Sequence, residues 1–272
     1  MLIALLTDFG TSDTYVGAMK GVILGRDPAA RFVDLSHDVP PQDIRRAAFL
    51  LATTAPVFPM GTTFLVVVDP GVGTERRGLA IDAAGWRFVG PDNGVFAWTL
   101  RFLAEEGRIE LDVAPVGLAL TQPAGAVELT EQRFWRPQIS STFHGRDIFA
   151  PVAAELSLGR ALEDLGRPVE RIVDLPWPVP RREPNGTVRA ELVTVDRYGN
   201  LITSLRPEDL PSSPLFDVGG RRIVGLAPHF QTDAPLVALV GSSGLVEIAA
   251  PNGSAARLLG LGPGAVVRVE SG

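Results

Sequence analysis

Short apolar runs alternate with helix-like stretches through the first half of the chain. Residues 2–6, 32–35 and 64–68 are apolar runs of strand length, and further strands are expected at 79–82 and 86–89. Apolar positions with helical spacing follow the first run, fill residues 41–55 and return at about residues 94–104. Strands that alternate with helices predict an α/β domain with a mostly parallel central sheet, and the run 64–68 is expected at its centre.

This helical periodicity disappears after a segment that contains four prolines between residues 174 and 186. The runs beyond it are short and have β character; they cover residues 188–195, 201–205, 222–225, 236–240, 245–249 and 265–270. We therefore expect three parts: an N-terminal α/β domain over 1–173, a proline-rich linker over 174–186, and a C-terminal antiparallel β-barrel-like domain over 187–272.

The amino-acid composition limits the kinds of binding partner that are expected. The net charge of -6 disfavours binding to nucleic acid or to an anionic membrane, so a small molecule is the better expectation. The absence of cysteine excludes disulfides, a thiolate nucleophile and zinc sites of the cysteine type. The first apolar run lacks a basic start and is too short for a secretory core, which predicts a cytoplasmic protein.

The first candidate for chemistry is the segment from Asp69 to Arg77, which reads DPGVGTERR and follows the third expected strand. Two glycines allow the backbone to approach a ligand, while a guanidinium folds back toward the acid. A tight turn with a surface ion pair is an equal alternative. Arg76 stands where a dinucleotide fingerprint needs its third glycine, so a nicotinamide-dependent oxidoreductase is unsupported. Because ligands bind at the carboxyl ends of parallel strands, Asp8, Asp38 and Asp69 are expected to line one crevice.

The second candidate is His144, which precedes a glycine and an expected helix start near Asp147. Taken alone, a surface histidine and a helix-capping acid are the favoured interpretation. The three histidines share no metal-binding spacing, so no metal site is expected. The polar segments 90–94, 195–200 and 241–244 are, singly, more often only turns.

Together, six segments resemble one family, the S-adenosyl-L-methionine (SAM) hydroxide adenosyltransferases, or SAM hydrolases, which are related to fluorinase and chlorinase. The matching segments are 6–13, 68–77, 90–94, 142–147, 195–200 and 241–244. They occur in the family's order and cover most of the chain. The resemblance implies an N-terminal α/β domain, a C-terminal β-barrel-like domain, and a homotrimer with SAM sites between neighbouring subunits. It also implies that water attacks ribose C5′ of SAM and releases adenosine and L-methionine, without a cofactor or a metal.

By the same resemblance, Asp69, Arg76 and His144 activate the water. The halide-using relatives lack the acid and the histidine, so the chain resembles the hydrolase branch. Whether Asp69 or His144 takes the proton stays open, and the choice of Arg76 over Arg77 rests only on spacing. A halogenase and a noncatalytic SAM or adenosine sensor are the alternatives.

Substrate contacts are carried over in the same way. Asp8 matches the acid that binds the ribose hydroxyls, and Asn93, in the third segment, is expected to contact the substrate. Asp196 and Asn200 match positions that hold the methionine end, where Asp196 pairs with the ammonium. Ser243 lies in the segment that contacts the same end.

Overall fold

The computed structural model describes residues 1–115, 117–121, 124–231 and 233–272. The chain forms two compact units, Met1–Pro176 and Trp177–Gly272. The boundary between them falls within the proline-rich segment 174–186. Arg181–Arg182 of that segment form strand β10, which pairs with β11, so these two residues belong to the second unit.

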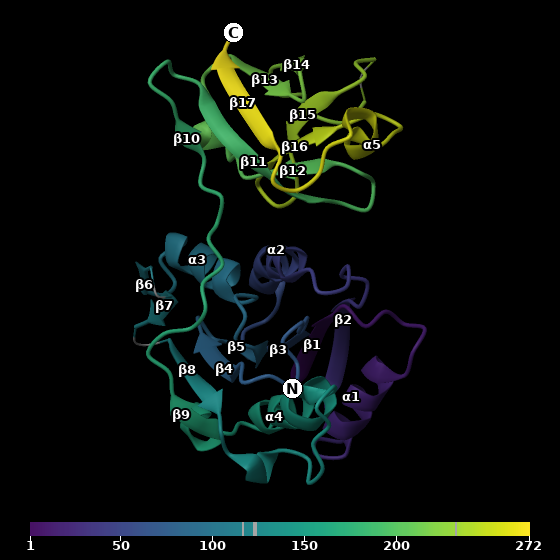
Figure 1. Ribbon diagram of the computed structural model, residues 1–272, viewed down its shortest axis with the longest axis vertical. Helices are drawn as coiled ribbons and strands as arrows, with labels where there is room; N and C mark the ends of the chain where they lie inside the picture. The colour runs from purple at the N-terminus through teal and green to yellow at the C-terminus, as the bar shows by residue number, and fades with distance from the viewer. Residues whose placement is uncertain (116, 122–123, 232) are drawn as a thin grey trace. The chain divides into compact units, whose positions relative to one another are not determined.

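The first unit is a sheet covered by helices on both faces (Figure 1). Its sheet has the strand order β2-β1-β3-β5-β4-β8-β9; β2, β1, β3 and β5 are parallel, and β4, β8 and β9 continue the sheet antiparallel. Helices α1 and α4 pack together on one face, and α2 and α3 pack together on the other. The predicted α/β class is confirmed. The strands are β1 (Leu2–Thr7), β2 (Arg31–Ser36), β3 (Thr63–Val67), β4 (Gly78–Ala83), β5 (Trp86–Pro91), β8 (Gly125–Leu129) and β9 (Gly166–Pro168), beside the separate hairpin β6 (Leu111–Ala114) and β7 (Gly117–Leu120). The helices are α1 (Tyr15–Leu24), α2 (Ile44–Thr54), α3 (Ala97–Glu105) and α4 (Ala150–Ser157).

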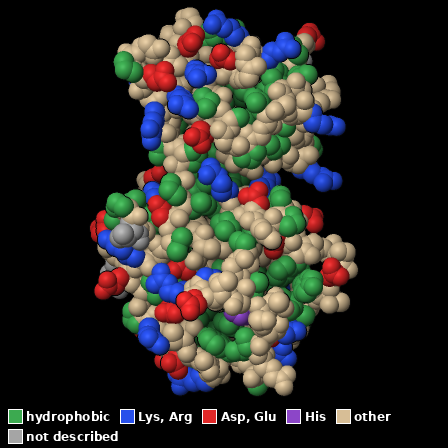
Figure 2. All heavy atoms as spheres, in the orientation of Figure 1, with side chains coloured by type: hydrophobic (Ala, Val, Ile, Leu, Met, Phe, Trp, Pro, Cys, Tyr) green, Lys and Arg blue, Asp and Glu red, His purple; other side chains and the backbone are tan. Residues whose placement is uncertain are grey.

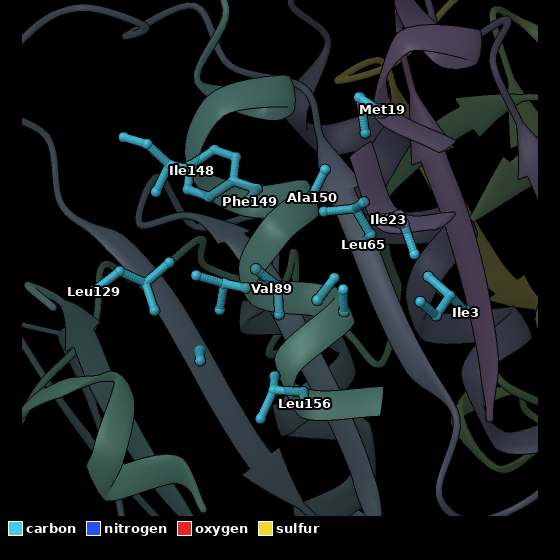
Figure 3. Packing of buried hydrophobic residues seen from close by; sticks show 14 of the residues in the cluster. Ile3, Met19, Ile23, Leu65, Val89, Leu129, Ile148, Phe149, Ala150 and Leu156 are labelled. Atoms are coloured by element: carbon cyan, nitrogen blue, oxygen red, sulfur yellow. The ribbon is translucent and has the colours of Figure 1, made fainter. Parts of the chain in front are cut away.

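The interior strands explain the continuous apolar runs of the sequence. All five residues of β3 are buried, because a parallel strand with helices on both faces has no solvent-facing side. Strand β3 lies between β1 and β5, one position from the middle of the order. Figure 3 shows Leu65 of β3 among the side chains of Ile23 in α1, Val89 in β5 and Leu156 in α4, which belong to one buried cluster.

Strand pairing sets the position of the first charged loops. Thr7 of β1 pairs with Val67 of β3 in parallel register. The chain therefore leaves both strands at the same edge of the sheet, where Asp8 follows β1 directly and Asp69 follows β3 after one residue.

The second unit is an antiparallel barrel-like sheet with the order β14-β13-β17-β11-β12-β16-β15, as predicted. Strands β14 and β15, at the two ends of this order, contact each other. Buried aliphatic side chains and Phe216 fill its interior. The strands are β11 (Val188–Val195), β12 (Leu201–Thr203), β13 (Pro214–Val218), β14 (Arg221–Val224), β15 (Val237–Val240), β16 (Val246–Ala249) and β17 (Val266–Ser271), and the helix is α5 (Ala255–Leu259).

Within the described part of the chain, no helix combines the length and the apolar character needed to cross a membrane.

Candidate active site

The loop after β3 carries the first group of charged side chains. Asp69 opens a turn in which its carbonyl accepts a hydrogen bond from the Val72 amide at 3.2 Å. Gly73 has φ of +78°, and a Cβ there would lie 2.3 Å from the carbonyl oxygen of Ser141. Glycine is therefore required where this loop passes the segment that leads to His144.

Arg76 folds back onto Asp69. Its Nε donates to Oδ1 and Oδ2 at 2.9 and 3.1 Å, and its Nη2 donates to Oδ2. The side chains of Arg76 and Asp69 are only 12% and 5% exposed, so solvent screens this pair weakly. The guanidinium also lies 5.0 Å from the ring centre of Phe149. The fork and the ring contact together hold the arginine in one orientation.

His144 completes the network from the start of the π-helix η3 (Gly145–Phe149). Its Nδ1 lies 2.9 Å from Nη2 of Arg76. A guanidinium only donates, so Nδ1 accepts, and the neutral ring carries its proton on Nε2. Burial lowers the pKa of His144 below the ordinary value of 6.5; the charge of Arg76 lowers it further, against the opposing charges of Asp69 and Asp147. His144 is therefore neutral at pH 7 and presents an Nε2–H donor.

Asp147 holds the segment that carries His144. Its side chain is 0% exposed. Oδ1 accepts from Arg136 and Arg146, both at 2.7 Å, and Oδ2 accepts from the Ser140 amide at 2.8 Å and from Arg146 at 2.9 Å. Burial alone would raise the pKa of Asp147, but these hydrogen bonds outweigh it and lower the pKa to about 2. The acid that the sequence places at a helix start thus ties residues 136–147 together.

Asp147→Asn should lower the free energy of unfolding by about 2 kcal/mol at pH 7, because a pKa lowered from 3.8 to about 2 is worth about 1.36 kcal/mol per unit. Since the folded-state pKa is the lower one, this contribution is complete well above pH 3.8 and is lost as the pH falls through about 2. Urea unfolding at pH 7 and pH 3 measures it, and the difference between wild type and variant should shrink at pH 3. The control is Asp164→Asn, whose side chain is 48% exposed and 3.9 Å from Arg160; its effect should stay below about 0.5 kcal/mol. A difference of the same size at both pH values would contradict this role of Asp147.

A cavity of about 360 Å³ opens beside the network and is lined by Asp69, His144 and Asp8. Oδ2 of Asp8 accepts a hydrogen bond from the Gln42 amide at 2.7 Å, and Gln42 also lines the cavity. Two of the three predicted catalytic side chains, Asp69 and His144, thus share a cavity with the predicted ribose-binding acid. The third, Arg76, is hydrogen-bonded to both Asp69 and His144.

Three aromatic rings, which the sequence did not single out, form another part of the cavity wall. They are Phe9, Tyr15 and Phe143, and their ring centres lie 5.2 to 5.7 Å apart. Phe9 follows Asp8 and Phe143 precedes His144 in the chain, so adjacency to the charged residues was the available signal. The rings give the cavity an apolar part beside its polar groups.

The structure separates Arg76 from its neighbour Arg77. The Nε of Arg77 donates to Asp92 at 2.8 Å, and its Nη2 donates to the carbonyl of Arg171. Burial raises the pKa of Asp92, although the Val173 amide and Arg77 act against it. Arg77 therefore supports the loop after β5 and does not reach Asp69.

Two other predicted residues lie outside this cavity. The amide of Asn93 donates to the Val68 carbonyl at 2.9 Å and accepts from the Val95 amide at 3.2 Å, which secures the end of β3. Asn93 is not among the residues that line the cavity. Asp38 is exposed and does not line it either, so the expectation of a crevice shared by Asp8, Asp38 and Asp69 is wrong for Asp38.

The second unit has a cavity of its own, of about 730 Å³, lined by Asp196, Asn200 and Ser242. The Asp196 carboxylate accepts from the Tyr198 amide at 2.9 Å, from the Asn200 amide at 2.8 Å and from the Asn200 side chain at 2.9 Å. The predicted Ser243 is not among the lining residues, and its hydroxyl is buried without a partner among the described residues. Ser242 is the serine that faces this cavity.

The residues that the structure describes include no group of three or more histidine, cysteine, aspartate or glutamate side chains arranged to hold a metal ion.

Comparison with known proteins adds to this geometry. Residues 3–166 match the family model of the SAM hydroxide adenosyltransferase N-terminal domain, and residues 190–268 match that of the C-terminal domain. The chain is 43% identical to the (R)-S-adenosyl-L-methionine hydrolase of Thermus thermophilus, over 97% of each chain. It is 26% identical to a fluorinase of an Actinoplanes species, over 77% of this chain and 73% of the fluorinase. The crystal structure of an uncharacterized conserved protein from Thermotoga maritima superposes with a TM-score of 0.83 at 32% identity, covering 98% of this chain and 99% of that one.

Proposed function

Because the chain belongs to the SAM hydroxide adenosyltransferase family, we propose that it hydrolyses SAM to adenosine and L-methionine at the cavity lined by Asp69 and His144. The single observation that supports this most is the hydrogen-bonded chain from Asp69 through Arg76 to His144 at the cavity wall.

The leaving group of this reaction needs little activation by the protein. Methionine departs from the sulfonium as a neutral thioether, so neither an acid nor a metal is needed to activate it. Water is a poor nucleophile, with a pKa of about 15.7, and must lose a proton as its oxygen bonds to C5′. Holding water and C5′ at ~3–3.5 Å in line with the sulfur removes much of the entropic barrier.

We assign proton acceptance to Asp69. In the neutral His144 ring, Nδ1 accepts from Arg76 and Nε2 carries the proton, so the imidazole orients the water by donating and has no free lone pair for its proton. Oδ1 of Asp69 accepts only from Nε of Arg76 among the described residues, which leaves it able to accept a second proton donor. The water thus lies between an acceptor and a donor, whose separation Arg76 fixes.

Asp8 is proposed to bind the ribose. Its Oδ2 is held by the Gln42 amide, while its Oδ1 receives no hydrogen bond from the described residues and can accept from a ribose hydroxyl. Asp8 and Asp69 follow adjacent parallel strands and line the same cavity, so a ribose bound by Asp8 would lie in the cavity that also holds the water at Asp69.

The finer points of assembly and location stay predictions. A homotrimer with SAM sites between neighbouring subunits rests on the family resemblance. The cytoplasmic location rests on the sequence. Acidic and basic side chains are interspersed on the face shown in Figure 2, and the net charge is -6; both favour a small-molecule substrate over nucleic acid or an anionic membrane.

The reaction is tested by incubating the purified protein with SAM in ¹⁸O-enriched water, without metal or halide, and analysing the products by mass spectrometry. We expect L-methionine and adenosine labelled at the 5′-hydroxyl, because the attacking oxygen comes from water. A parallel sample with chloride or fluoride should give the same products.

Three results would contradict the proposal. Intact SAM after long incubation would favour a noncatalytic sensor, and 5′-halogenated adenosine would favour a halogenase. Unlabelled adenosine would exclude attack of water at C5′.

A further inference from the structure

His37 is a buried histidine that the site described so far does not use. It follows β2 directly and is only 7% exposed. Its Nδ1 lies 2.8 Å from Oγ1 of Thr7, the last residue of β1, and Thr7 is fully buried. Its Nε2 lies 3.0 Å from Oδ1 of Asp34 on β2. The imidazole therefore joins β2 to the end of β1, the strand beside it in the sheet.

Asp34 determines how the protons of this network are arranged. Burial raises the pKa of Asp34, but hydrogen bonds from Lys20 and His37 outweigh it and lower the pKa below the ordinary value of 3.8. The carboxylate is therefore charged at pH 7 and only accepts, so Nε2 of His37 carries a proton. In the neutral ring, Nδ1 then accepts from the Thr7 hydroxyl, and the oxygen of that hydroxyl accepts from the Phe9 amide at 3.3 Å.

Two further hydrogen bonds join the loop after β1, which carries Asp8, to the loop after β2. The Gly10 amide donates to the His37 carbonyl at 2.8 Å. The Gln42 amide donates to Oδ2 of Asp8 at 2.7 Å. The two loops are thereby fixed against each other, and both contribute residues to the wall of the candidate active-site cavity.

We propose that His37 is a positioning residue that acts through Thr7 to hold Asp8 and Phe9 where they bind the adenosyl half of SAM. This inference rests on the proposed function. His37 is not among the residues that line the cavity, so it affects the ligand only through the loop after β1. Small displacements of a binding group are costly, so release of this loop weakens the ribose contact. The hydrogen bonds between Asp69 and Arg76 do not involve this loop.

The test removes each partner of the contact between Thr7 and His37. Adenosine is titrated calorimetrically into full-length Thr7→Val, which keeps the side-chain shape without the hydroxyl, and into His37→Phe, which keeps a ring without the acceptor. Each should bind adenosine at least ~10-fold more weakly and raise the KM for SAM similarly, while kcat changes less than about threefold. Thr7→Ser keeps the hydroxyl and should retain the wild-type affinity. The double variant should be no weaker than the weaker single variant, because both substitutions break one contact.

Thr63→Val is the matched control. Thr63 lies at the opposite end of the β1–β3 pair, is also fully buried, and its hydroxyl has no hydrogen-bond partner among the described residues. This variant should bind adenosine as wild type does, which separates loss of the contact from loss of any buried hydroxyl.

Four results would overturn the proposal: wild-type adenosine affinity in Thr7→Val or in His37→Phe, an equal loss in Thr7→Ser, an equal loss in Thr63→Val, or losses that add in the double variant. Each of them can occur in a protein that hydrolyses SAM. Failure of the wild type to hydrolyse SAM would instead contradict the proposed function itself.

Discussion

Asp69→Asn is expected to lower kcat for SAM hydrolysis by roughly 10²–10⁴-fold, the range for loss of a general base. The substitution keeps the shape of the side chain but removes the negative charge and the acceptor that takes the proton from water. It also leaves Arg76, 12% exposed, without its anionic partner, so the orientation of His144 is lost as well. Asp69→Ala should fall in the same range.

Steady-state kinetics with adenosine detection measure this loss, and adenosine binding by calorimetry shows whether the cavity survives. We expect the adenosine affinity to change less than threefold, because the proposed ribose contact is made by Asp8. Asp38→Asn is the matched control: Asp38 follows strand β2 of the same sheet but is exposed and lies outside the cavity. Full activity in both Asp69 variants would remove Asp69 from the reaction.

The parts of the fold that were predictable are those with one dominant signal. Strands β1 and β3 are buried on both faces, so their sequences read as continuous apolar runs. Strands β6, β9 and β13 were not expected. They have three to five residues each, and several of those residues are partly exposed. Such strands exist because of their neighbours, and that information is not local in the sequence.

The candidate site was also only partly predictable from the sequence. Asp8 and Asp69 were correctly placed together because both follow adjacent parallel strands. The prediction for Asp38 was wrong because the chain turns after β2. His37 is buried, with its Nδ1 2.8 Å from Oγ1 of Thr7, and the next residue, Asp38, is exposed to solvent. A strand end predicts an edge of the sheet, but the following turn decides which side chain reaches the cavity.

The choice between Arg76 and Arg77 depended on side-chain direction. Arg76 and Arg77 are adjacent where the chain extends into β4, and adjacent side chains in extended backbone point to opposite sides. One therefore reaches Asp69 and the other Asp92.

Removal of the His144 side chain should also cost about 10²–10⁴-fold in turnover, and the pH dependence of the wild type identifies the form that works. The network needs neutral His144, because Nδ1 must accept from Arg76 at 2.9 Å, and protonation would place two cations against each other. Since the pKa of His144 is lowered below 6.5, kcat/KM should be level above that pH and fall as the pH drops through the lowered pKa.

His144→Asn separates this titration from the chemistry, because an amide oxygen still accepts from Arg76 but does not take up a proton in this range. We expect low activity that no longer falls between pH 7 and pH 5, whereas His144→Ala loses both the acceptor and the orientation of Arg76. If the acidic fall persisted unchanged in His144→Asn, another group would carry it. If wild-type activity instead rose as the pH fell below 6.5, the working form would be the imidazolium, and the hydrogen bond from Arg76 to Nδ1 would have to break before each turnover.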